Sequence, residues 1–282
     1  MTAVDTVSGV GVRYAIVFNI NTDTGLPNVD TASATPVQGT LIEGIKTFSP
    51  SAAAPQQIPH YGDDRVFAQD QLPPSDLDTF TITTAKSNLA LDAMLEGVIV
   101  RSVGTAKMKA AATDQRGSEP QLFFATYRQA LDTEKGSSTL GTKRQWHMVV
   151  YPSVRVYPSA QGFEQAATDK TYSATPTSVS KTPFGESMAS ATDGATESTY
   201  FEFTCDYQPR WNAYKGDGTI TSFALSHPPY SSDYLTVYDN GTEVTPSSVN
   251  TSTANPAFTL SDAPDNGNIV MALIQTNVPG NT

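Results

Sequence analysis

The stretch of residues 49–78 is the strongest constraint on how this chain can fold. It reads SPSAAAPQQIPHYGDDRVFAQDQLPPSDLD and contains five prolines, at positions 50, 55, 59, 73 and 74. Because no apolar repeat typical of a strand or a helix persists through it, the sequence predicts a long irregular loop without a partner strand in its own sheet. Loops longer than about 12–15 residues are uncommon in compact domains and are usually functional or disordered.

The apolar content of this loop argues against plain disorder, because a solvated linker needs few large apolar side chains. We therefore expect the loop to dock on another surface, and the alternative is a lid folded over its own domain. The residues expected to make the contact are Pro55, Ile58, Pro59, Tyr61, Asp63, Asp64, Arg65, Val66, Phe67 and Leu72.

Strand-like segments flank the loop and recur along the chain. Before the C-terminal part they cover residues 13–19, 41–48, 79–83, 98–103, 107–111, 121–130, 144–151, 154–157 and 200–207. The segment 161–199 is rich in Ser, Thr and Ala, and it fits either a surface excursion or a short strand pair. The pattern predicts a mainly β fold whose N-terminal part is a β-sandwich or barrel.

One amphipathic helix is predicted over about residues 84–96. Thr84 can cap its start, and Gly97 stands where a helix end is expected. Leu91, Met94 and Leu95 form its apolar side, and Lys86, Asn88 and Asp92 its polar side. We expect the helix to cover one face of the sheet or barrel.

The charge pattern divides the chain near Lys215. The formal net charge is −11, and no Lys or Arg follows Lys215 up to Thr282. Short strand-like segments with Gly, Asn and Pro turns, including the Asn-Gly pair at residues 240–241, predict a small antiparallel β-sandwich there. We expect a first domain over residues 1–212 and a self-contained module over residues 213–282. The acidic balance disfavours tight binding of nucleic acid.

Candidate catalytic groups are scattered. The three histidines, His60, His147 and His227, share no local motif, and the single Cys205 is expected to be a buried apolar side chain. Calcium ligation by Asp63 or Asp64 is an alternative to simple solvation of the loop. We expect no enzymatic activity, no cofactor and no metal site. We also expect no signal peptide and no membrane helix, and therefore synthesis in the cytoplasm.

Several stretches, spanning residues 12–212, carry a resemblance to a known family. They are RYAIVFNINTDTGLP with TLIEGIKTF, the loop ending in GDDRVFAQDQLPPSDLDTFTIT, the helix TAKSNLALDAMLEG, and the late strands RQWHMVVYPSVRVYP and YFEFTCDYQPRWN. In order and pattern they resemble the major tail (tail tube) proteins of long, non-contractile bacteriophage tails. The ending from GDGTITSFALSHPP onward looks like a loosely immunoglobulin-like β-sandwich module found on phage structural proteins.

The resemblance implies a structural virion subunit. Hexameric rings of such subunits stack into a tail tube that conducts DNA during ejection, the long loop contacts the adjacent ring, and an added C-terminal module projects outward. It also implies the tape-measure, tail terminator and tip proteins as partners, and passage of genomic DNA without tight binding. Host-surface glycans are a candidate partner of the C-terminal module, and no membrane partner is expected.

Other functions stay open at this point. A carbohydrate-binding or adhesin-like virion protein is the main alternative, followed by another virion part such as a capsid decoration or tail terminator protein.

Overall fold

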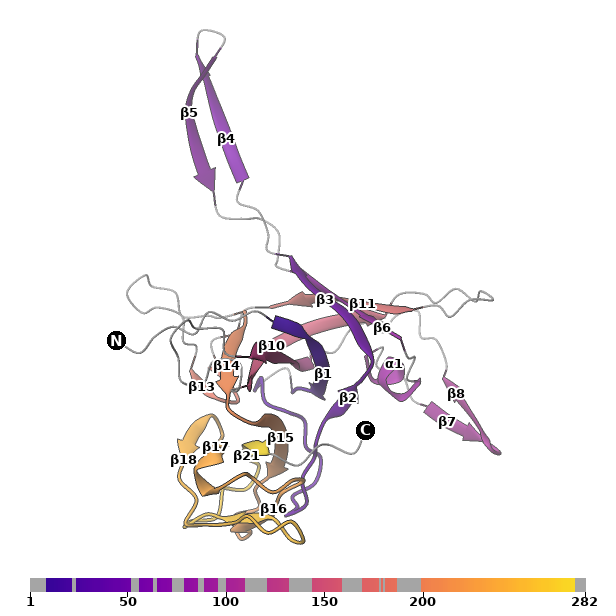
Figure 1. Ribbon diagram of the computed structural model, residues 1–282, viewed down its shortest axis with the longest axis vertical. Helices are drawn as coiled ribbons and strands as arrows, with labels where there is room; N and C mark the ends of the chain where they lie inside the picture. The colour runs from indigo at the N-terminus through magenta and orange to yellow at the C-terminus, as the bar shows by residue number, and fades with distance from the viewer. Residues whose placement is uncertain are drawn as a thin grey trace.

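The fold is mainly β, as predicted, with one short helix (Figure 1). The computed structural model describes residues 9–21, 24–51, 56–62, 65–72, 79–85, 89–95, 100–109, 121–131, 144–158, 169–177, 179, 181–186 and 199–276. A large antiparallel sheet forms the N-terminal unit, and two smaller antiparallel sheets form the C-terminal unit.

The large sheet has eight strands in the order β2-β1-β9-β10-β11-β6-β3, with β14 paired to β10. Most of the predicted segments lie at least partly in one of these strands, namely 13–19, 41–48, 79–83, 121–130, 144–151, 154–157 and 200–207. Their bounds are β1 Gly9–Asn19, β2 Thr40–Ile42, β3 Ile45–Ser51, β6 Thr79–Thr84, β9 Gln121–Leu131, β10 Arg144–Pro158, β11 Lys170–Pro176 and β14 Phe201–Cys205.

Two of the predicted strands, 144–151 and 154–157, are a single strand, β10. Its register with β9 shifts between Tyr151 and Val154, where Pro152 lies. Proline has no N–H to donate to a ladder, so it is tolerated in a strand at such an irregularity. The proline that divides the pattern in the sequence therefore marks a bulge in one long strand.

The central strands of the large sheet are buried on both faces, which explains why the segment around β1 is almost continuously apolar. Along β1, Tyr14, Ile16 and Phe18 enter one core, and Ala15 and Val17 enter another. The second core also takes in residues of β2, β3, β6, β10 and β11, although β2 and β3 stand at opposite ends of the strand order. The sheet therefore curls around this core, and α1 packs on it with Leu91 and Leu95.

The helix α1 spans Leu89–Leu95, and it is shorter than predicted. Thr84 does not cap it: Thr84 is the last residue of β6, and its buried hydroxyl donates to the carbonyl of Lys170 at 3.5 Å. Asp92 is not on a solvated side either, because it is only 5% exposed. Residues 86–88 and 97 lie outside the described part of the chain.

The first C-terminal sheet has the order β15-β21-β17-β18, and the second has the order β16-β20-β19. The turn between β17 and β18 has positive φ at Asn240 (48°) and Gly241 (86°), as the Asn-Gly pair predicts. The bounds are β15 Gln208–Lys215, β16 Ser222–Ala224, β17 Leu235–Asp239, β18 Thr242–Val244, β19 Ser248–Asn250, β20 Ala257–Thr259 and β21 Ile269–Thr276, with the 3-10 helix η2 over Ser232–Tyr234.

The strand β21 joins the two units because its two faces lie in different cores. Met271 and Leu273 pack in the core that contains β1 and β9. Val270, Ala272 and Ile274 pack in a separate core with residues of β16, β17 and β20. The three largest sheets therefore stack as layers, in the order large sheet, β15–β21 sheet and β16–β20 sheet.

The C-terminal module has a core of its own between its two sheets, and it also shares a core with the large sheet. Trp211 and Ala213 of β15 lie in the core shared with the large sheet. The segment between β1 and β2 also contacts the C-terminal unit, because Val37 and Ala213 exchange backbone hydrogen bonds of 2.9 and 2.8 Å. The division between residues 212 and 213 stays a prediction, and it falls inside β15.

Two smaller hairpins lie outside these three sheets, and a third, between β3 and β6, belongs to the candidate site described below. The pair β7 Val100–Val103 and β8 Ala106–Lys109 projects from the side of the large sheet (Figure 1). The pair β12 Lys181–Thr182 and β13 Gly185–Glu186 is very short. Together with β11, it shows that the described part of 161–199 contains strands.

Candidate functional site

The segment predicted as an irregular loop contains a regular β-hairpin. β4 spans Gln56–Gly62 and β5 spans Arg65–Leu72, and the two strands pair antiparallel over their length. The prediction of irregular structure is therefore wrong for these residues. Gly62 and the two aspartates after it are turn-forming residues between two strand-length runs, and this signal could have identified the hairpin from the sequence.

The hairpin register places most of the predicted contact residues. Tyr61 is opposite Val66, and Pro59 is opposite Gln69. The register shifts between His60 and Tyr61, so that Phe67 is the extra residue of a β-bulge. Ile58, Arg65 and Leu72 also lie in the two strands, and Pro55, Asp63 and Asp64 lie outside the described residues.

The hairpin stands apart from the large sheet, at one end of the longest axis of the molecule (Figure 1). It is an excursion between β3 and β6, which are themselves paired up to Ser51 and Thr79. The chain therefore leaves the sheet and returns to it at neighbouring points. This placement contradicts the alternative of a lid over its own domain.

The outer edges of the hairpin are open within the described structure. Among the described strands, β4 pairs only with β5. Unpaired strand edges present backbone N–H and C=O groups to another chain. An isolated two-stranded hairpin is also marginally stable in water. Both properties favour a hairpin that becomes fully ordered against a partner.

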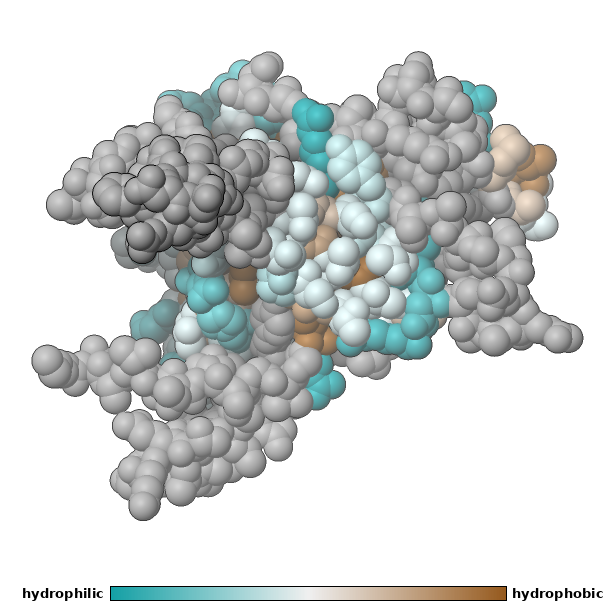
Figure 2. Space-filling view, turned by 90° about the horizontal axis from the view of Figure 1, so that it is seen from above, coloured by the Kyte–Doolittle hydropathy of each residue, from teal (hydrophilic) through white to brown (hydrophobic). Residues whose placement is uncertain are grey.

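A face rich in hydroxyl groups adjoins the root of the hairpin. Figure 2 looks down on this face and shows mildly polar side chains across its centre. The strands β3, β6 and β11 alternate inward apolar residues with outward Ser or Thr, and register pairs such as Ser49 with Thr81 and Ser173 with Thr81 align these outward residues. The residues are Thr47, Ser49, Ser51, Thr79, Thr81, Thr83, Thr171, Ser173 and Thr175.

The nine members of this Ser/Thr face are uncharged, but the exposed Arg155 of β10 lies directly opposite Thr175 and therefore on the same side of the sheet. Burying a charge without a partner is costly, whereas hydroxyl groups can be satisfied by hydrogen bonds to a neighbour. A neighbour that covers the face can therefore satisfy its hydroxyl groups, and it needs an acceptor for the charge of Arg155.

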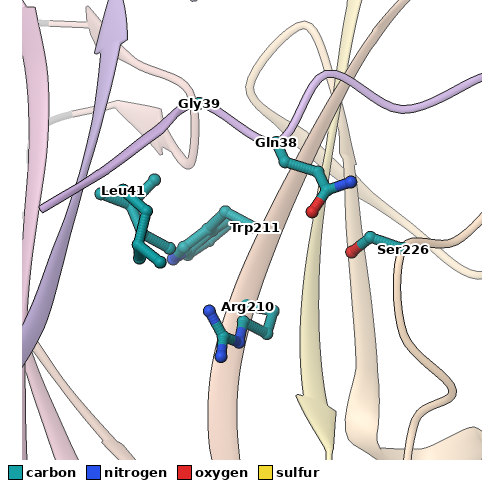
Figure 3. Close-up of a pocket in the computed structure, with 7 residues that line it drawn as sticks. Gln38, Gly39, Leu41, Arg210, Trp211 and Ser226 are labelled. Carbon is teal, nitrogen blue, oxygen red and sulfur yellow. The ribbon is translucent and has the colours of Figure 1, made fainter. Parts of the chain in front are cut away.

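A small pocket lies between the two units, with a volume of about 70 Å³ (Figure 3). Ligand pockets typically measure about 300–1,000 Å³. Gly39 at its edge has φ +71°, and a Cβ there would meet Ile16 and Phe18 at 2.9 Å, so this backbone position needs glycine. The pocket is lined by Ile16, Gln38, Gly39, Leu41, Arg210, Trp211 and Ser226, and its small size makes it a packing gap rather than a ligand site.

The remaining candidate groups do not converge. His147 lies 3.6 Å from the carboxylate of Glu202, across the β10–β14 pair. His227 contacts the hydroxyl of Ser226 at 3.0 Å, and burial together with the nearby Arg210 lowers its pKa. Within the described ranges, no three His, Cys, Asp or Glu side chains come together in a way that could hold a metal ion.

Cys205 is buried, as predicted, and only 2% exposed. Burial, assisted by the charge of Asp206, raises the pKa of its thiol to about 12. The thiol is therefore protonated at neutral pH and is not an activated nucleophile.

Comparisons with known proteins add no assignment. No family model matches the sequence, and no curated protein and no solved structure matches it significantly. No helix in the described part of the chain is long and apolar enough to cross a membrane.

Proposed function

We propose that this chain is the structural subunit of a bacteriophage tail tube, in which hexameric rings stack and the β4–β5 hairpin contacts a neighbouring subunit. The observation that carries the proposal is the hairpin itself. It is a two-stranded hairpin whose outer edges are unpaired among the described strands, and it lies apart from the large sheet (Figure 1).

The arrangement of the molecule also supports assembly. The hairpin lies at one end of the longest axis and the C-terminal sheets lie at the other (Figure 1). A hairpin in this position can reach an adjacent subunit without displacing the C-terminal unit. The Ser/Thr face beside its root offers hydroxyl groups that a neighbour can satisfy by hydrogen bonds, and the exposed Arg155 borders it.

The charge of the chain suits a conduit for DNA. At a net charge of −11, a tube wall built from this protein would repel the phosphate backbone rather than bind it. Such a wall lets a genome pass without holding it. In this proposal the tape-measure, terminator and tip proteins bind the ends or the interior of the tube.

The proposal is tested by removing the hairpin while keeping the sheet. Because Ser51 and Thr79 are register partners in β3 and β6, residues 52–78 can be replaced by an Asn-Gly turn. The concentrated wild-type protein is expected to form hollow tubes of even width in negative-stain electron microscopy. The excised variant is expected to stay monomeric with an unchanged far-UV circular dichroism signature of β structure.

A matched control separates the hairpin from the other protruding hairpin. Shortening β7–β8 by replacing residues 102–107 with an Asn-Gly turn removes an excursion of similar character. This variant is expected to assemble as the wild type does. Tubes formed by the protein without residues 52–78, or no polymer from the wild type at any concentration, would rule out the hairpin as the assembly element.

A further inference from the structure

Three tyrosines gather on the surface of the C-terminal unit. The ring centroids of Tyr207 and Tyr230 lie 4.0 Å apart with an interplanar angle of 16°, so the two rings stack. Tyr234 stands nearly perpendicular to both, at 4.9 Å from Tyr207 and 5.6 Å from Tyr230. We call these three residues the tyrosine cluster.

The backbone that carries the tyrosine cluster is fixed by Gln275 of β21. The side-chain oxygen of Gln275 accepts from the N–H groups of Asp206 at 3.0 Å and Tyr207 at 3.4 Å. Its backbone carbonyl accepts from the N–H of Tyr230 at 2.9 Å. A set of rings held in place before a ligand arrives loses little conformational freedom on binding.

One ring face in the cluster is left open. The three centroid separations put Tyr234 beside the stacked pair rather than on top of it, so among the aromatic rings of the described residues Tyr207 is the one that stacks on a face of Tyr230. Tyr230 is 52% exposed, which makes it the most exposed large apolar side chain among the described residues of the C-terminal unit. Its outer face is therefore available for stacking.

The surroundings of the open face are acidic and hydroxyl-rich. Asp206 and Asp233 are both exposed next to cluster residues, and no Lys or Arg occurs from Gly216 to the end of the chain. A hydrogen bond between the hydroxyls of Tyr207 and Tyr230, followed by burial, raises the pKa of Tyr207 to about 12. The hydroxyl of Tyr207 is therefore protonated at physiological pH, and the exposed carboxylates of Asp206 and Asp233 disfavour an anionic ligand.

We propose that the tyrosine cluster is a binding site for neutral saccharides. The C–H face of a pyranose ring carries the slight positive charge that the negative face of an aromatic ring attracts. It would stack on the outer face of Tyr230, while the carboxylates of Asp206 and Asp233 accept hydrogen bonds from the sugar hydroxyls. The site does not depend on tube formation, because all its residues belong to one chain.

Saturation-transfer NMR on the full-length protein tests the site with defined probes. The neutral probes are maltohexaose, a β-1,4-galactotetraose and a chitotetraose, and the acidic control is a tetragalacturonate. At least one neutral probe is expected to receive saturation, strongest at the C–H groups of one ring face, with millimolar affinity. The acidic probe is expected to receive none.

Substitutions identify the ring that binds. Tyr230→Ala is expected to weaken binding about tenfold, equivalent to about 1.4 kcal/mol. Tyr230→Phe keeps the ring and is expected to stay within about threefold of the wild type. Tyr200→Ala removes a tyrosine of similar exposure (49%) from the other unit, and it is expected to change nothing.

Two outcomes would overturn the proposal. One is the absence of saturation transfer to all three neutral probes from a protein that is shown to be folded by its cooperative thermal unfolding. The other is equal binding by wild type and Tyr230→Ala. A decaproline peptide is measured in parallel, because proline-rich segments also stack on tyrosines, and binding of this peptide without any sugar would assign the cluster to peptides instead. The ability of the same variants to form tubes is scored separately by microscopy.

Discussion

Asp92 of α1 and Lys170 of β11 form a buried ion pair. The carboxylate oxygen Oδ2 lies 3.5 Å from Nζ, and each side chain is only 7% exposed. The hydroxyl of Tyr172 donates to the other carboxylate oxygen at 2.7 Å. This pair connects the helix to the sheet across a contact that is otherwise apolar, through Leu91 and Leu95.

Removing one partner of this pair is expected to destabilise the protein strongly. Asp92→Ala leaves a buried ammonium group without its carboxylate, and breaking a buried pair in this way costs about 3–5 kcal/mol. Urea denaturation gives the change in the free energy of unfolding. The double variant Asp92→Leu with Lys170→Met is expected to be more stable than Asp92→Ala, since it leaves no buried charge. A single variant as stable as the wild type would show that the pair is solvated in solution.

The shared core is expected to make the two units unfold together. Trp211 is 1% exposed and packs against Phe184 and Phe124 at centroid distances of 4.8 and 5.0 Å. Trp211→Ala is therefore expected to cost about 3–5 kcal/mol. Trp146→Ala, at a partly exposed position, is expected to cost less.

Calorimetry checks this coupling directly. A single transition is expected for the wild type, and Trp211→Ala is expected to lower its midpoint without splitting it. Two separate transitions, with only one of them shifted by the substitution, would mean that the units fold independently.

Asp217 is expected to make the stability of the C-terminal unit depend on acid pH. Its carboxylate accepts hydrogen bonds of 2.7 Å from the N–H groups of Thr219 and Ile220, and these bonds, led by that of Ile220, lower its pKa from the ordinary 3.8. Because the folded pKa lies below the unfolded one, the stabilising contribution is complete above the unfolded value. It is lost as the pH falls through the folded value.

The comparison of wild type with Asp217→Asn measures this effect. The wild type is expected to be the more stable protein in urea at pH 7, and the difference is expected to shrink as the pH falls below 3.8 and to vanish below the lower pKa of the folded protein. If the difference in the free energy of unfolding is as large at acid pH as at pH 7, Asp217 acts through turn geometry alone. Asp262→Asn, at an exposed aspartate of the same unit, serves as the control.

Assembled tubes are expected not to bind duplex DNA. The chain carries −11, and its last 67 residues contain no cation that could displace a phosphate counterion. At about 0.1–0.15 M salt, where screening reaches only ~8–10 Å, a sedimentation assay is expected to leave the duplex in the supernatant. Tight co-sedimentation would contradict the conduit role and would leave solubility as the reason for the acidic composition.

The sequence predicts the elements that repeat a local pattern. Alternation and apolar runs identify β1, β9 and most of β21, and the Asn240-Gly241 pair identifies the turn after β17, because these signals lie within a few residues of one another. The existence of a mainly β fold with one helix follows from the same signals.

Other features depend on partners that are distant in the sequence. Asp92 looks like a solvated helix residue until Lys170 is placed beside it, and no local pattern pairs positions 78 residues apart. No strand is predicted at β15 because Pro209, Arg210 and Asn212 interrupt its apolar pattern, and its pairing partner β21 is distant in the sequence. The β4–β5 hairpin is not predicted because no apolar repeat persists through residues 49–78, and Pro59 is accommodated in a strand whose outer edge is unpaired among the described strands.

The position of β21 has a consequence for the order in which this protein can fold during synthesis. β21 is translated after every other described strand, yet both the core against β1 and the core against β16 need its side chains. A ribosome-bound chain that lacks these eight residues exposes apolar surface on two layers at once. The synthesis of β21 is therefore a condition for closing both cores, because a chain that stops before it leaves both unfinished and becomes a substrate for chaperones and proteases rather than for assembly.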